Sequence, residues 1–137
     1  MSLEKAKESV RWFFESDFND VTAGLDQHIT RDYKYHSPNG EEDGTAYIAG
    51  MNDILRAFPD VKFQIKDIVA EADKVATRWV LTGTHQGEYM GIPATNRKIT
   101  ISGVAIDHMR GSKIAETWSY FNPMELMQQL GVTGPTA

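Results

Sequence analysis

The sequence predicts an α+β fold in which helices from the first half of the chain pack on one face of a curved antiparallel sheet. Apolar residues recur at helical spacing up to residue 58, and from residue 61 they alternate with polar residues, as in strands with one wet face. Short turns at residues 73–74 and 111–112 predict antiparallel hairpins. A long twisted sheet curls, and helices that close it on one side produce a cone whose interior holds side chains or a ligand.

Three helices are expected before the sheet. The first covers residues 3–17 and is capped by Ser2, and the second is short and is capped by Asp20. The third helix begins at Thr45 and ends at Pro59, which cannot continue a helix. The apolar stripe of the third helix consists of Ile48, Met51, Leu55 and Phe58.

The strand predictions begin with a short strand at residues 33–36, which is stopped by the turn sequence at residues 37–40. The acidic residues 41–43 are interpreted as a solvated loop. A short closing helix follows the sheet, with Asn122 as its cap and a proline at its first position. The four long strands of the sheet are expected at residues 61–66, 75–84, 98–109 and 114–121.

Length and composition restrict the classes of function. A chain of 137 residues without repeats or linkers is expected to form one domain, residues 1–137. Its net charge of −5 would repel nucleic acid and anionic membranes, so neither partner is expected. The chain contains no cysteine, no signal-peptide pattern and no apolar run long enough to span a membrane, and a cytoplasmic location is expected.

No metal or cofactor site is expected. None of the four histidines lies in a His-Glu-x-x-His helix or beside cysteines, and the isolated glycines do not form a phosphate-binding loop. The Gly-x-Ser-x-Gly motif of serine hydrolases is also absent. These observations leave a cofactor-free pocket that uses carboxylate, imidazole, tyrosine or water.

Two carboxylates on neighbouring strands are candidates for acid–base chemistry. Asp107 and His108 are adjacent on a strand and point to opposite faces. Counting back through the turn at residues 111–112 places Asp107 opposite Glu116, and facing carboxylates on a buried face would raise at least one pKa. Arg78 on the next strand could neutralise them, which would make the group a structural ion cluster. Both interpretations remain open.

Two histidines are further candidates. His36 follows two tyrosines on the short strand, and it faces either the pocket or the backbone of a loop edge. His85 begins a loop at the rim of the cone, where it serves either acid–base chemistry or a packing contact. The candidate catalytic residues are therefore Asp107, His108, Glu116, His36 and His85. The candidate pocket-lining residues are Tyr35, Arg78, Trp118, Ser119 and Met51.

Three segments carry a resemblance to a known family. They are FPD at residues 58–60, TGTHQGEYMGIP at residues 82–93 and GSKIAETW at residues 111–118. Together they resemble the SnoaL-like polyketide cyclases, and the likeness extends over nearly the whole chain. The resemblance implies the nuclear-transport-factor-2-like α+β cone, a homodimer packed through the sheet, and cofactor-free aldol closure of the last ring of an aromatic polyketide ester, a hydrophobic small molecule.

The sequence departs from this family at the expected acid–base groups. In the cyclases the catalytic carboxylate follows the tryptophan of a Glu-His-Trp-Asp-like run, whereas residues 116–119 here read ETWS. Ser119 therefore stands where the resemblance places an aspartate, and Ala105 stands where it places a partner histidine. Serine is a poor base without an activating neighbour. Two functions follow as hypotheses: a cofactor-independent cyclase, isomerase or lyase that uses another residue, and a non-catalytic binding protein for a hydrophobic metabolite.

Overall fold

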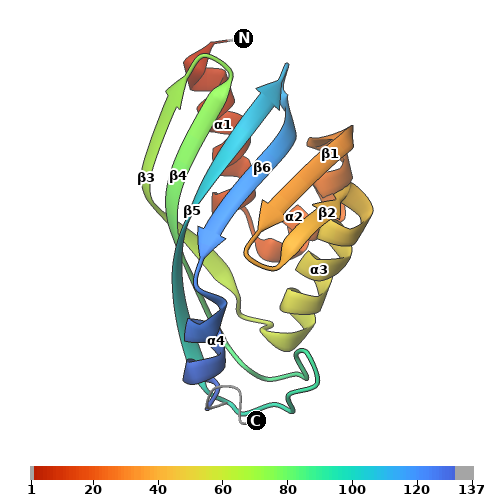
Figure 1. The fold of residues 1–137 in the computed structure, drawn as a ribbon, viewed down its shortest axis with the longest axis vertical. Helices are drawn as coiled ribbons and strands as arrows, with labels where there is room; N and C mark the ends of the chain where they lie inside the picture. The colour runs from red at the N-terminus through yellow and green to blue at the C-terminus, as the bar shows by residue number, and fades with distance from the viewer. Residues whose placement is uncertain (1, 132–137) are drawn as a thin grey trace.

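A computed structural model describes residues 2–131 and confirms the α+β class, with a curved sheet that does not close on itself (Figure 1). The six strands lie in the order β2-β1-β6-β5-β4-β3. The helices are α1 (Leu3–Glu15), α2 (Phe18–Gly24), the 3-10 turn η1 (Leu25–Gln27), α3 (Gly44–Ala57) and α4 (Pro123–Gln129). The strands are β1 (Ile29–Ser37), β2 (Gly40–Asp43), β3 (Lys62–Glu71), β4 (Lys74–Thr84), β5 (Lys98–Arg110) and β6 (Lys113–Phe121).

The helix ends follow from capping side chains. Ser2 accepts a hydrogen bond from the backbone of Lys5, as predicted for the start of α1. The second helix differs from its prediction because Asp17 rather than Asp20 is the cap. Asp43 caps α3, and this helix begins one residue earlier than predicted. The buried face of α1, which consists of Ala6, Val10, Phe13 and Phe14, contributes to the hydrophobic core.

The first half of the chain contributes more to the sheet than the sequence predicted. The expected short strand at residues 33–36 is the nine-residue strand β1, and the acidic residues 41–43 belong to β2 rather than to a loop. β1 pairs antiparallel with the edge strand β2 and parallel with β6, so the first and the last strand of the chain lie side by side within the sheet. Local periodicity contains no information about this parallel pairing, because the paired residues are far apart in the sequence.

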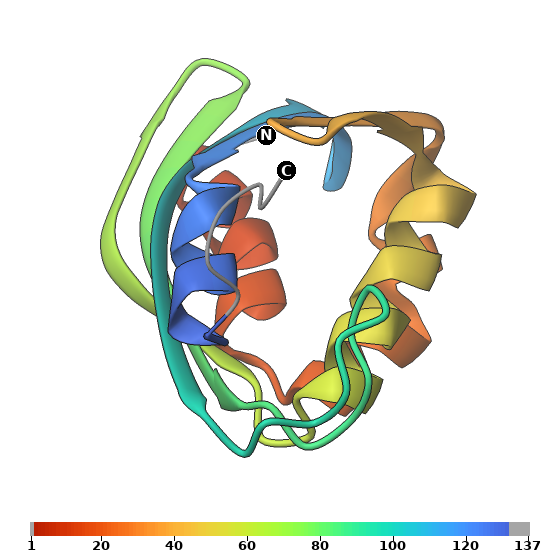
Figure 2. The ribbon, with the colours of Figure 1, turned by 60° about the horizontal axis from the view of Figure 1, so that its bottom comes forward.

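The helices and the curved sheet form a ring in the view of Figure 2, with α3 on the side opposite β4 and β5. α1 packs mainly against β3. Gly103 on β5 provides room for the indole ring of Trp79, since a Cβ atom at this position would overlap the ring. Within residues 2–131, no helix combines the length and hydrophobicity needed to cross a membrane.

The pairing of β5 with β6 corrects the predicted register by one residue. Asp107 lies opposite Thr117, and His108 lies opposite Glu116. The prediction was wrong because β6 contains a bulge: His108 pairs with Glu116 and Met109 with Ile114, which leaves Ala115 as an extra residue. A shift of one residue moves a side chain to the other face of a sheet. Thr117 therefore faces the inside of the cone and Glu116 faces outward.

Candidate functional site

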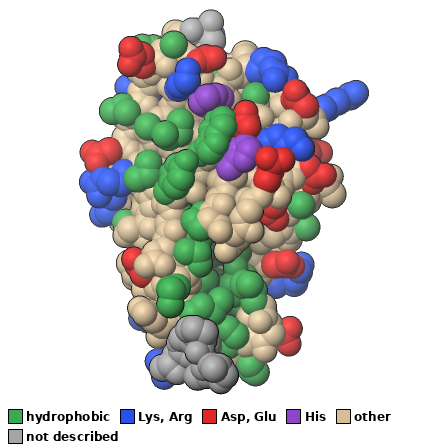
Figure 3. All heavy atoms as spheres, viewed as in Figure 1, with side chains coloured by type: hydrophobic (Ala, Val, Ile, Leu, Met, Phe, Trp, Pro, Cys, Tyr) green, Lys and Arg blue, Asp and Glu red, His purple; other side chains and the backbone are tan. Residues whose placement is uncertain are grey.

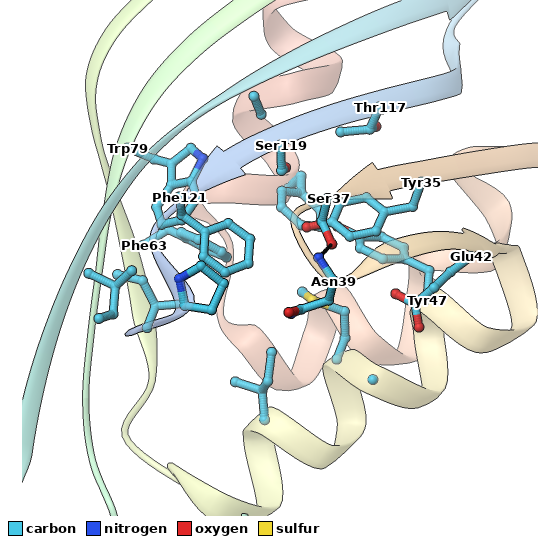
Figure 4. Close-up of a pocket in the computed structure, with 18 of the residues that line it drawn as sticks. Tyr35, Ser37, Asn39, Glu42, Tyr47, Phe63, Trp79, Thr117, Ser119 and Phe121 are labelled. Carbon is cyan, nitrogen blue, oxygen red and sulfur yellow. Dashed lines mark hydrogen bonds between the residues drawn. The ribbon is translucent and has the colours of Figure 1, made fainter. Parts of the chain in front are cut away.

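The interior of the cone contains a cavity of about 350 Å³, which lies at the lower end of the range of about 300–1,000 Å³ typical of small-molecule sites. Most of the cavity wall is apolar and aromatic. Figure 4 shows Phe63, Trp79 and Phe121 together on one side of it, across from Tyr35 and Tyr47. A cavity with such walls suits a hydrophobic ligand.

A chain of hydrogen bonds lies on the polar side of the cavity. Tyr33 on β1 donates from its hydroxyl to Thr117 Oγ1 at 2.8 Å, and Thr117 donates to Asp107 Oδ1 at 2.6 Å. All three residues line the cavity and are buried, and Asp107 is only 4% exposed. The register of β5 and β6 brings Asp107 and Thr117 side by side, while the parallel pairing of β1 with β6 supplies Tyr33.

Burial changes the acidity of these groups. Desolvation raises the pKa of Asp107 to about 7, and the hydrogen bond from Thr117 opposes this rise. The pKa of the Tyr33 phenol is also raised, mainly by burial, so Tyr33 remains a neutral hydrogen-bond donor. At neutral pH the Asp107 carboxyl therefore occurs in both its protonated and its ionised form. A carboxyl with this property can accept and return a proton under physiological conditions.

The Ser119 hydroxyl lies next to this hydrogen-bonded chain on the same two strands. Ser119 pairs with Ala105, and this is the next inward-facing pair after Asp107 and Thr117 on β5 and β6. Both Ala105 and Ser119 line the cavity. Burial raises the pKa of Tyr35, and the Ser119 hydroxyl partly offsets the rise as a hydrogen-bonding neighbour. Ser119 and Tyr35 thus present neutral hydroxyl groups to a ligand near Asp107.

Four of the sequence candidates form a cluster on the outer face of the sheet. His36 Nε2 lies 2.5 Å from Glu116 Oε2, and the His36 ring stacks on Trp118 at a centroid distance of 4.9 Å. His108 contacts the same indole ring at 4.6 Å. The structure brings these residues together, but none of them lines the cavity. Trp118, which the sequence placed in the pocket, is outside because the β6 bulge reverses the face.

Arg78 and His85 also lie outside the cavity. Arg78 forms an ion pair with Asp67 at 2.6 Å on the outer face, so it does not neutralise Asp107. His85 is fully buried, and its Nδ1 accepts a hydrogen bond from the backbone N–H of Thr95 at 3.2 Å. This bond anchors the rim loop, which supplies Tyr89 to the cavity wall. Met51, also expected in the pocket, lines the cavity from α3.

Sequence reasoning missed several functional groups. Thr117 was missed because its direction depends on the bulge. Tyr33 has a signal in the sequence, because it alternates with Tyr35 and must share the face of Tyr35. Glu42, which lines the cavity from β2, was assigned to a loop. Among residues 2–131, no three histidine, aspartate or glutamate side chains lie in an arrangement that could hold a metal ion.

Comparisons with known proteins agree with this geometry. The sequence matches the SnoaL-like polyketide cyclase family over residues 5–130. A comparison with curated proteins gives no match.

Similar solved structures cover almost the whole chain. AclR from Streptomyces galilaeus, a candidate hydroxylase, is 28% identical with a TM-score of 0.88, and the alignment covers 97% of this chain and 100% of AclR. IdmH from Streptomyces antibioticus, a candidate polyketide cyclase, is 26% identical with a TM-score of 0.80 and coverage of 93% and 99%. A candidate polyketide cyclase from Acidithiobacillus ferrooxidans is 29% identical with a TM-score of 0.76 and coverage of 98% and 100%. The cone, its internal cavity and the match over residues 5–130 together establish that this chain belongs to the SnoaL-like polyketide cyclase family.

Proposed function

We propose that this chain catalyses cofactor-free, acid–base ring closure of a hydrophobic polyketide ester, with Asp107 as the proton-transferring residue. The observation that carries the proposal is a buried carboxyl with a pKa of about 7 in the wall of an apolar cavity. A general base works best when its pKa lies near the working pH. The family relationship supports the cyclase reaction type, while Asp107 is inferred from the site itself.

The proposed reaction requires one positioned carboxylate. Ionised Asp107 removes a proton from the carbon between two carbonyl groups of the substrate, which forms a delocalised enolate. The enolate carbon then bonds to a carbonyl carbon at the other end of the same molecule, and that carbonyl oxygen becomes an alkoxide. Protonated Asp107 returns its proton to the alkoxide. The hydroxyls of Tyr35 and Ser119 are positioned to stabilise an oxyanion, and the cavity holds the two reacting ends together.

The proposal includes a shift in the position of the catalytic carboxyl. The resemblance places the acid–base groups at Ser119 and Ala105, and these residues pair with each other directly beside the pair of Asp107 and Thr117. We infer that the catalytic carboxyl, which the resemblance places at position 119 on β6, is supplied in this chain by Asp107 on β5, in the next inward-facing pair. Ser119 then retains a hydrogen-bonding role. The support is that both positions face the same cavity.

The function is tested by incubating the pure protein with an anthraquinone β-keto ester and following ring closure by chromatography. We expect the native chain to close the ring well above the uncatalysed rate. A Ser119→Asp variant serves as comparison, because it restores a carboxyl at the position that the family resemblance indicates. Closure only by this variant would contradict the role of Asp107, and closure by neither protein would contradict the proposed reaction.

A non-catalytic binding protein for a hydrophobic metabolite is the alternative function. It is favoured by the residues Ser119 and Ala105, which lack the acid–base groups that the resemblance implies. The same cone hosts different activities, as the candidate hydroxylase AclR illustrates. Tight binding of the β-keto ester without proton exchange or ring closure would support this alternative.

We further propose that two copies of the chain associate through the outer face of the sheet. Figure 3 shows hydrophobic side chains gathered on this face, where Val104 is 38% and Tyr120 is 60% exposed. Exposed apolar patches of this kind often mark interfaces.

In sedimentation experiments we expect the native chain to be a dimer and a Val104→Lys/Tyr120→Lys double variant to be a monomer. A matched Met124→Lys change on α4, which is also exposed, should leave the dimer intact; a native monomer would contradict the proposal.

A further inference from the structure

A carboxylate stands at the side of the cavity, and the proposed reaction does not use it. Glu42 lines the cavity from β2 and is half-buried. It lies directly opposite Tyr35 across the β1–β2 pair, so both side chains lie on the same face of the sheet. Among residues 2–131, no lysine, arginine or histidine lies within ion-pair distance of Glu42, whereas its neighbour Glu41 lies 3.7 Å from Lys34 and 3.4 Å from His36.

Aromatic rings surround this carboxylate. Figure 4 shows Glu42 beside Tyr35 and Tyr47, whose rings lie 4.3 Å apart, and Tyr89 of the rim loop lines the same cavity. Burial raises the pKa values of Tyr35 and Tyr89, and the negative charge of Glu42 raises both further, together with the charge of Asp53 for Tyr89. A carboxylate among phenol rings attracts an organic cation through charge and through the faces of the rings.

The charges of the whole cavity favour the same kind of ligand. Its described lining includes two carboxyl groups, Asp107 and Glu42, and no lysine, arginine or histidine. An anionic ligand would lose its hydration on entry and meet no compensating positive charge. A protonated amine near Glu42 would instead replace its lost hydration with a charge-assisted hydrogen bond.

We propose that Glu42 forms a recognition site for a protonated amine, so that the cavity prefers hydrophobic ring ligands that carry a basic nitrogen and rejects those that carry a carboxylate. This inference rests on the proposed function in one respect, namely that the cavity is the ligand site. The ring system occupies the apolar interior, its reactive end lies near Asp107, and the amine lies between Glu42 and the tyrosines.

The inference is tested with three ligands that share one ring system and differ in charge: 2-(aminomethyl)anthraquinone, 2-(hydroxymethyl)anthraquinone and anthraquinone-2-carboxylate. Binding at pH 7.5 is measured by calorimetry and by quenching of tryptophan fluorescence, to which Trp79 contributes from the cavity wall. We expect the amine to bind about tenfold more tightly than the neutral alcohol, as a charge-assisted hydrogen bond at a half-buried site would give. The carboxylate should bind more weakly than the alcohol.

Two isosteric variants assign the preference to one residue. Glu42→Gln should remove most of the preference for the amine while leaving the affinity for the alcohol nearly unchanged. Glu41→Gln removes the same charge one residue away, and it should retain the preference because Glu41 pairs with Lys34 and His36. High salt should weaken the preference of the native chain, because the carboxylate is only half-buried.

The outcomes separate this inference from the proposed function. Binding of the alcohol without a preference for the amine, or a preference that persists in Glu42→Gln, would overturn the role of Glu42 and leave the acid–base proposal standing. Failure of all three ligands to bind would overturn the inference, whereas ring closure of the β-keto ester decides the acid–base proposal separately.

Discussion

Replacement of Asp107 by asparagine is expected to lower the rate of ring closure by about 10²–10⁴-fold, the usual contribution of general acid–base catalysis. Asparagine keeps the shape of the side chain and can still accept the hydrogen bond from Thr117, but it cannot take up a proton. The reaction is followed by chromatography of the ring-closed product. Exchange of the acidic proton of the β-keto ester with D₂O, followed by NMR, reports the first step by itself.

The pH profile distinguishes a proton-transferring role from a structural one. Because the pKa of Asp107 is about 7, kcat/KM of the native chain should rise as the pH increases through neutrality and then level off. The residual activity of Asp107→Asn should lack this titration. Asp67→Asn is the matched control, since Asp67 is exposed and forms an ion pair with Arg78 away from the cavity. A native rate and pH profile in Asp107→Asn would exclude Asp107 as the base.

The same substitution is expected to change how the free energy of unfolding depends on pH. Folding raises the pKa of Asp107 from 3.8 to about 7, so the folded protein holds this proton more tightly than the unfolded chain does. The resulting stabilisation is fully present below about pH 4 and is lost as the pH rises to about 7. Each tenfold change in proton affinity is worth about 1.4 kcal/mol, and the full effect is on the order of 4 kcal/mol.

Urea denaturation of the native chain and of Asp107→Asn between pH 4 and pH 8 measures this effect. The difference between the two proteins removes the contributions of other titrating groups, such as the exposed Asp32, whose pKa is lowered mainly by its hydrogen bond to Arg110. We expect the native chain to lose stability relative to the variant as the pH rises, and the loss to end above about pH 7. A difference that is independent of pH would show that Asp107 titrates normally.

Much of the fold could be predicted from local patterns. Helical spacing located the long helices α1 and α3, and alternating spacing located the long strands β3, β4, β5 and β6, because side-chain direction follows directly from the backbone period. The acidic strand β2 was missed because its four residues are too few to show a period. The parallel pairing of β1 with β6 was missed because it joins segments about 80 residues apart, such as His36 and Trp118.

The candidate site was predictable only in part, and on β6 the reason is a single residue. Asp107, Ser119, Tyr35 and Met51 were among the sequence candidates and line the cavity. Glu116 and Trp118 were assigned by counting through a regular hairpin, and the extra residue Ala115 shifts every later position on β6 by one. A bulge of this kind is stabilised by contacts with the neighbouring strands and has no reliable local signature.

The sequence by itself determined the α+β class, the family and the presence of an acidic residue at position 107, because these depend on periodicity and on motifs within continuous segments. Only the tertiary structure decided that Asp107 faces Thr117 inside an apolar cavity, that Tyr33 reaches Thr117 from 84 residues away, and that Glu116 faces outward. The pKa of a carboxyl depends on its distance from water and on its hydrogen bonds. Both are properties of the packed sheet, so the chemistry of this site arises only when the strands are paired.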